Sequence, residues 1–124
     1  MDTKDKAALA ERLGAKIAEL RLNVDMTQSD LAERLGIGDE HVSRFERGAV
    51  LPTLPRLLDI AEVFQTGFDE LVLGASPRID DQGMWMANRI SELSPADREF
   101  VRETVDRLAG HLGSKAELDK RGKR

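Results

Sequence analysis

Apolar residues recur at steps of three and four along most of the chain, a spacing that predicts helices rather than strands. The pattern is sharpest at 27–48, where two such segments are separated by Gly36 and Ile37. Thr27 is a suitable N-cap for the first segment, because its hydroxyl can accept a hydrogen bond from a free N–H group of the first turn. Gly36 can end that helix, since glycine enters the left-handed region at little cost. We therefore expect two short helices joined by a tight turn, the second at 39–47.

The rest of the chain predicts an all-α protein. Further helices are expected at 6–22, 54–64, 68–73, 84–92 and 95–112, with a frayed start at 1–5. The expected apolar stripes are Leu13, Ile17, Leu20 and Val24 on the first helix, and Leu54, Leu57, Leu58, Ala61 and Phe64 on helix 54–64. The predicted organisation is a helical domain at 6–73, a linker at 74–83, C-terminal helices at 84–112 and a disordered basic tail at 113–124.

The last predicted helix carries a narrow apolar seam of the kind that pairs helices in coiled coils. Its members are Val101, Val105, Leu108 and Leu112, spaced four, three and four residues apart. Such a seam either joins two copies of the chain or covers the chain's own apolar surface. Trp85 lies between two methionines, and it is expected in the core or in the same dimer interface; lining a ligand pocket is a third interpretation.

Composition excludes several classes of protein. The 124 residues carry a net charge of −4 and no cysteine, which rules out disulfides, thiolate metal sites and cysteine nucleophiles. The two histidines, His41 and His111, lie in no zinc-binding pattern, so neither a metal nor another cofactor is expected. The sequence shows no apolar run long enough for a membrane span, no secretion signal and no P-loop, nucleophile elbow or dinucleotide fingerprint. We expect a cytoplasmic protein that is not an enzyme.

The stretch around the predicted turn resembles the helix-turn-helix of the Cro/C1-type (Xre-type) phage-repressor family. The resemblance covers about residues 13–73 and is carried, in order, by Arg21, Thr27-Gln28, Leu31-Ala32, Leu35-Gly36-Ile37, Val42-Ser43-Arg44, Glu46, Gly48 and Pro52. It implies a five-helix domain, followed here by a C-terminal helical extension, whose third helix enters the major groove of double-stranded DNA. It further implies a sequence-specific transcriptional repressor that binds a palindromic operator as a homodimer.

The resemblance also implies roles for single residues. The positions expected to face DNA are Gln28, Asp39, Glu40, His41, Ser43, Arg44, Arg47 and Arg56. Arg44 is the expected main specificity residue, because a guanidinium can donate two hydrogen bonds to the O6 and N7 of guanine. Gln28 corresponds to a phosphate contact at a helix N-terminus. Arg21 and Glu46 correspond to a structural ion pair that joins the first helix to the third.

Two features depart from the family pattern and leave a second function open. Asp39 and Glu40 are acidic where polar or basic residues are commoner; they either accept from the N4 amine of cytosine or only stabilise the helix N-terminus. The loop 49–51 has no cation, and residues 27–56 hold four arginines against five acids. The alternative is a protein-interaction module, such as an antitoxin or an adaptor, that uses the same fold to bind a protein partner.

Overall fold

The computed structural model describes residues 1–122, in which seven helices and no strand occur. The helices are α1 (Thr3–Asn23), α2 (Gln28–Leu35), α3 (Asp39–Glu46), α4 (Leu54–Val63), α5 (Phe68–Leu73), α6 (Ile79–Ile90) and α7 (Pro95–Gly122). The chain divides into two compact units, Met1–Ala87 and a second unit that begins at Asn88. No helix among the described residues is long and apolar enough to cross a membrane. The expected all-α fold with a C-terminal helical extension is confirmed.

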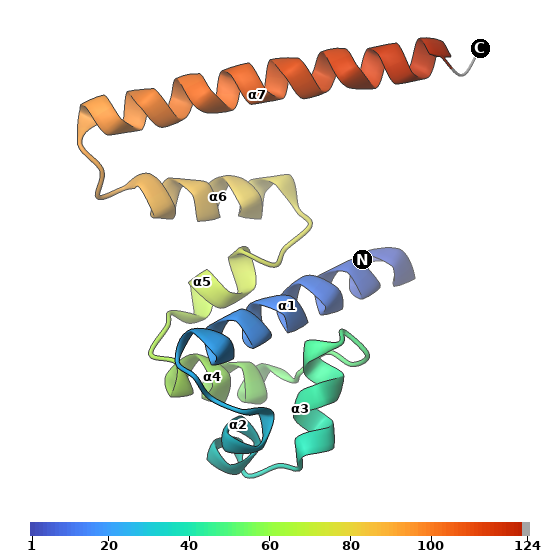
Figure 1. Cartoon of the computed structure of the whole chain (residues 1–124), viewed down its shortest axis with the longest axis vertical. Helices are drawn as coiled ribbons and strands as arrows, with labels where there is room; N and C mark the ends of the chain where they lie inside the picture. Colours follow the sequence, from blue (N-terminus) through green and yellow to red (C-terminus); the bar gives the residue numbers. More distant parts are fainter. Residues whose placement is uncertain (123–124) are drawn as a thin grey trace. The chain divides into compact units, whose positions relative to one another are not determined.

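The core of the first unit gathers one face from each of α1 to α5. In this unit α1 packs against α3 and α5, while α2 packs against α3 and α4 (Figure 1). The buried cluster consists of Leu13, Ile17, Leu31, Ala32, Leu35, Val42, Phe45, Ile60, Ala61, Leu71 and Ala75. Burial of this shared apolar surface is what holds such short helices in place, since helices of eight residues are not stable alone.

The turn between α2 and α3 is built by the residues that the sequence pattern singled out. Thr27 caps α2 through a reciprocal pair of hydrogen bonds with Asp30, in which each side chain accepts from the other residue's backbone N–H. Gly36 ends α2 in the left-handed region with φ 71°. The backbone N–H of Ile37 then donates to the Ala32 carbonyl at 3.0 Å, which closes the turn.

A glycine allows α1 to lie directly on the end of α3. A Cβ added at Gly14 would lie 2.2 Å from the carbonyl oxygen of Phe45 and 2.8 Å from that of Glu46. Backbone atoms cannot withdraw from such a contact as a flexible side chain can. The side chain that is absent at Gly14 therefore sets how closely the first helix approaches the third.

Two expectations about α1 are wrong. The helix begins at Thr3, because the Asp2 side chain caps it by accepting from the Asp5 backbone N–H at 2.8 Å; residues 1–5 are therefore mostly helical and not frayed. Val24 is 57% exposed, because the helix ends at Asn23 and the chain turns through Asp25, which has a positive φ of 55°. A residue that continues the apolar spacing beyond a helix end no longer faces the core.

The face that α4 buries also differs from the expected one. Leu54 and Leu58 are 60% and 51% exposed, whereas Ile60 and Ala61 are buried and Leu57 and Phe64 pack against the cluster. The inward positions 57, 60, 61 and 64 form one stripe at helical spacing. Periodicity alone did not distinguish this stripe from the neighbouring one that contains the two exposed leucines.

The expected linker at 74–83 is only partly a linker. Helix α6 begins at Ile79, five residues before the expected start, and Ala75 and Ser76 are buried. The Ser76 hydroxyl accepts from the Arg78 backbone N–H at 3.1 Å and donates to Asp81 Oδ2 at 2.6 Å. These bonds supply partners for the first turn of α6, a local arrangement that the Gly- and Pro-rich composition did not reveal.

The second unit contains α7, whose extent corrects the expectation of a helix that ends near Leu112. The helix continues to Gly122, so the expected disordered tail is wrong for 113–122; Lys123 and Arg124 lie outside the described residues. This segment buries no side chain, but it contains good helix formers, Lys115, Ala116, Glu117, Leu118, Lys120 and Arg121. Its oppositely charged residues also recur at helical spacing, as Glu117 and Arg121 do.

Candidate nucleic-acid interface

Helix α3 presents one face to the core and the other to solvent. Val42 and Phe45 are 0% and 9% exposed, and they fix the helix against the buried cluster. The residues that the sequence placed on the DNA side lie on the opposite face: Asp39, Glu40, His41, Arg44 and Arg47 are exposed, and Ser43 is half-buried. Figure 1 shows α3 at the edge of the first unit, next to α2. Its polar face is therefore available to a groove of the duplex.

Glu40 lies between the two arginines of this face. Its Oε1 is 3.8 Å from Arg44 Nε, one helical turn along, and 3.5 Å from Arg47 Nη2. The three side chains are 51% (Arg44), 61% (Arg47) and 69% (Glu40) exposed, so water screens both pairs. Arg47 Nε also donates to the Ser43 carbonyl at 3.4 Å. Glu40 holds both guanidinium groups close to α3. A group that binds a guanidinium more strongly than Glu40 does can take its place.

The Arg21–Glu46 ion pair is present, and it is well protected from water. Arg21 Nε and Nη2 donate to the two Glu46 oxygens at 2.7 and 2.9 Å, and Arg21 Nη1 donates to the Met26 carbonyl at 2.8 Å. The two side chains are only 12% and 7% exposed. The hydrogen bonds to Glu46 raise the pKa of Arg21 despite partial burial. This pair joins α1, α3 and the start of α2.

Gln28 belongs to the same network. Its Nε2 donates to Glu46 Oε1 at 3.0 Å, so the residue expected to contact a phosphate is also tied to the ion pair. An amide nitrogen carries two hydrogens, which leaves a second donor for a phosphate oxygen. The network thereby fixes the first residue of α2 relative to α3, a link that the sequence did not reveal.

Asp39 and Arg56 each have a partner within the first unit. The Ser29 hydroxyl donates a short hydrogen bond to Asp39 Oδ2, which joins the first turns of α2 and α3; sequence reasoning missed Ser29. Arg56 Nη1 donates to the Leu35 carbonyl at 2.8 Å and lies 3.8 Å from Asp59. A cation at that carbonyl is favourable, because it satisfies a free acceptor at the C-terminus of α2. Both side chains therefore have structural roles in addition to the expected DNA contacts.

The acidic first turn of α3 also matches the polarity of the helix. The N-cap residue Gly38 supplies no side-chain hydrogen bond, so the free N–H groups of this end have no capping oxygen from that residue. Asp39 and Glu40 place negative charge where the helix dipole favours it. This is the structural role that the sequence left open for the two acids.

Apolar side chains come directly after the polar face of α3 in the sequence. This face consists of Asp39, Glu40, His41, Ser43, Arg44 and Arg47 and is called the recognition face below. Val50 and Leu51 in the loop after α3 are 42% and 36% exposed, and Leu54 and Leu58 on α4 are more exposed still. Many members of the family that the sequence resembles carry lysine or arginine in this loop, whereas this chain carries apolar side chains there. This loop therefore offers no cation for contact with a phosphate.

The residues expected in a dimer interface lie in different settings. Val105, Leu108 and Leu112 are 50%, 57% and 59% exposed along α7, and Val101 is half-buried. Trp85 is half-buried on α6, and a Cβ added at Gly74 would lie 3.1 Å from its Nε1. Trp85 thus lies close to the end of α5 within the first unit, whereas three of the α7 residues are at least half exposed in one copy.

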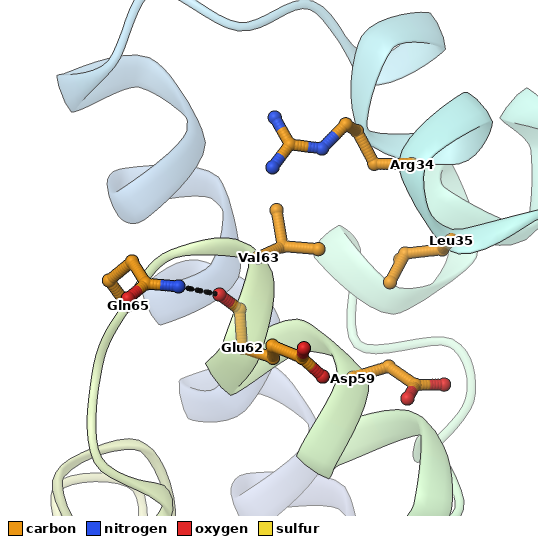
Figure 2. Close-up of a pocket in the computed structure, with 6 residues that line it drawn as sticks. All are labelled: Arg34, Leu35, Asp59, Glu62, Val63 and Gln65. Carbon is orange, nitrogen blue, oxygen red and sulfur yellow. Dashed lines mark hydrogen bonds between the residues drawn. The ribbon is translucent and has the colours of Figure 1, made fainter.

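An open cavity of about 440 Å³ lies between α2 and α4. It is lined by Arg34, Leu35, Asp59, Glu62, Val63 and Gln65 (Figure 2). None of these residues belongs to the set expected to contact DNA. Among residues 1–122, no three histidine or acidic side chains gather in a way that could hold a metal ion.

A capped α2, a left-handed glycine turn and an exposed polar α3 on a five-helix core define a helix-turn-helix DNA-binding protein. Comparison with known proteins agrees: residues 17–71 match the helix-turn-helix family model HTH_3. The chain belongs to this Cro/C1-type family, and it is a DNA-binding transcription regulator rather than an enzyme.

Two relatives illustrate the range of similarity. An uncharacterised HTH-type transcriptional regulator of Archaeoglobus fulgidus is 31% identical over 70 residues, which are 56% of this chain and 93% of that protein. The transcriptional repressor RstR of a cryptic CTXphi phage in Vibrio cholerae serotype O1 is 21% identical over 108 residues, which are 87% of this chain and 96% of the repressor. The second similarity extends beyond the helix-turn-helix into the C-terminal helices.

Proposed function

We propose that the chain is a sequence-specific transcriptional repressor that binds a palindromic operator as a homodimer. The observation that carries the proposal is the polar face of α3, which is exposed and lies beside the capped N-terminus of α2. Arg44 on this face donates to a guanine, while Gln28 and the first N–H groups of α2 contact a phosphate. Repression is the activity named for a relative that matches most of this chain. A protein that binds an operator acts inside the cell, and we expect this one in the cytoplasm.

Dimerisation is assigned to the seam of α7. Val101, Val105, Leu108 and Leu112 are spaced for pairing with a second helix, and three of them are at least half exposed in one copy. Two copies give two recognition helices, which contact half-sites about 34 Å apart on one side of the duplex. Because residues 27–56 carry a net charge of −1, one copy alone has little electrostatic attraction for phosphates and pairing supplies the missing contacts.

A mobility-shift titration against genomic fragments, followed by footprinting of the fragment that binds most tightly, tests this function. The expected result is a protected site with two inverted half-sites, bound with steep dependence on protein concentration. Protection of a single unrepeated site would contradict the homodimer on a palindrome. A folded wild-type chain that shifts no fragment, even at low salt, would contradict DNA binding altogether.

The exposed apolar side chains of the loop after α3 and of α4 support a second candidate function, a protein-interaction module. Val50, Leu51, Leu54 and Leu58 offer a protein partner a surface that DNA phosphates cannot use. An antitoxin or adaptor of this kind would bind a protein tightly and a duplex weakly. Purification of the chain with an associated protein that dissociates on Leu54→Asp substitution, together with no shifted fragment, would favour this function over the repressor.

A further inference from the structure

We propose that Glu40 determines specificity by occupying Arg44 and Arg47 until a duplex offers a better set of partners. The inference rests on the proposed DNA-binding function and extends it. In the free chain one carboxylate oxygen lies within 4 Å of both guanidinium groups, at 3.8 Å from Arg44 Nε and 3.5 Å from Arg47 Nη2. A phosphate that approaches either arginine therefore competes with Glu40 for its guanidinium group.

The other acids and cations near α3 do not have this position. Asp39 accepts from Ser29, and Glu46 is bound in the protected pair with Arg21. Arg56 donates to the Leu35 carbonyl and lies near Asp59, so its charge is also partly neutralised by its own unit. Arg44 and Arg47 are the exposed cations of the recognition face, and Glu40 is the acid that contacts both of them.

Displacement has different consequences on different duplexes. On an unrelated sequence Glu40 is left as an anion close to the phosphates, with no group that compensates for its lost arginines. On a site with a G·C pair beneath the first turns of α3, Arg44 can bind guanine while Glu40 accepts from the N4 amine of cytosine. The carboxylate thus weakens every complex except those that supply a donor for it.

A Glu40→Gln variant tests the proposal, with Glu62→Gln as the matched control. Both substitutions remove one negative charge, but Glu62 lies on α4 beside the cavity of Figure 2 and outside the recognition face. The probes are the duplex enriched by the wild-type chain from a randomised library and a shuffled duplex of the same length. Affinities are measured by fluorescence anisotropy at several salt concentrations.

We expect Glu40→Gln to tighten binding to the shuffled duplex about three- to tenfold and to the enriched duplex less than twofold, which lowers the specificity ratio. The salt dependence on the shuffled duplex should steepen by about one to two phosphate contacts, because the released arginines reach phosphates. Glu62→Gln should change neither the ratio nor the slope. In an Arg44→Ala/Arg47→Ala background the Glu40→Gln effect should disappear.

Four results would overturn the proposal. Equal tightening on both duplexes would show that Glu40 acts only through net charge, as would equal effects of Glu40→Gln and Glu62→Gln. Persistence of the full Glu40→Gln effect without the two arginines would show that their pairing is irrelevant. A folded wild-type chain that binds neither duplex would overturn the DNA-binding function itself, and this inference with it.

Discussion

Glu46 is the residue of α3 whose side chain is bound to two other helices at once. It accepts from Arg21 through both oxygens and from Gln28, and with them it connects the first three helices. A residue on the recognition helix can thus be essential for the shape of the DNA-binding face without contacting DNA. The sequence predicted the pair of Arg21 and Glu46 by resemblance, but not the participation of Gln28.

Glu46→Ala is expected to destabilise the fold by about 3 kcal/mol, because it leaves a largely buried guanidinium without its carboxylate. Urea denaturation followed by circular dichroism measures the change. The control is Glu19→Ala on α1. The Glu19 side chain lies 4.0 Å from Lys16 and is 61% exposed, so its loss should change the free energy of unfolding by no more than about 0.5 kcal/mol. Equal effects of the two substitutions would contradict the structural role of the Arg21–Glu46 pair.

Gly14→Ala is expected to destabilise the chain by about 1–3 kcal/mol, since the new methyl group would meet two backbone carbonyls of α3. Gly110→Ala on α7 is the matched control, because a Cβ there has no neighbour within 4 Å. Alanine should stabilise that helix by about 0.5–1 kcal/mol. Thermal melting of both variants tests the contrast, and a stabilised Gly14→Ala would refute the close approach of α1 to α3.

Asp30 makes the stability of the fold sensitive to acid. Hydrogen bonds from the Thr27 backbone and then from its side chain hold the pKa of Asp30 below its ordinary value of 3.8. The unfolded chain therefore takes up the proton more readily, so the stabilisation is complete above pH 3.8 and is lost as the pH falls through the lowered pKa.

The urea midpoint, measured from roughly pH 5 to 2, should fall less steeply in Asp30→Asn than in the wild-type chain. Glu33→Gln on the same helix removes an acid outside the cap and serves as the control. Identical pH profiles for Asp30→Asn and the wild type would mean that the cap contributes nothing to acid sensitivity.

At the scale of whole helices, the elements could be predicted, but only some of their ends could. The apolar spacing located every helix of residues 1–122, and Thr27 and Gly36 marked the ends of α2 correctly. Errors arose where a polar side chain decided the boundary. Asp2 extends α1 and Ser76 advances the start of α6, and neither residue stands out from its neighbours in an apolar pattern.

The seam of α7 is the element whose role depends most on a partner. Its apolar residues were found from spacing alone, and in one copy of the chain Val105, Leu108 and Leu112 are at least half exposed. Leu108→Asp should place a charge at the centre of the seam and convert the dimer to a monomer without unfolding the first unit.

Analytical ultracentrifugation with circular dichroism separates the two outcomes for Leu108→Asp. Leu118→Asp is the identical substitution off the seam, at a side chain that is 66% exposed, and it should leave the dimer intact. A monomeric wild-type chain would contradict the dimer, and an unfolded Leu108→Asp variant would show that the seam covers the chain's own core instead.

For the molecule as a whole, the fold was predicted more fully than the charge distribution of its DNA-binding face. Family resemblance gave the five-helix domain and the candidate residues. It did not show that Arg44 and Arg47 have an acidic partner, nor that Arg56 is bound to the end of α2, because such pairings depend on side-chain positions in the folded chain. We therefore expect one copy of the chain to bind DNA weakly, so that tight binding needs two copies.

The most direct test of the central claim is a binding titration of the wild type, Arg44→Ala and Arg47→Ala on the enriched duplex and on variants of it that replace single G·C pairs. We expect Arg44→Ala to lose about tenfold or more on the enriched duplex and to become indifferent to one G·C replacement. Arg47→Ala should weaken binding to all duplexes alike. Wild-type affinity and unchanged sequence preference in Arg44→Ala would contradict the claim that α3 reads DNA through this residue.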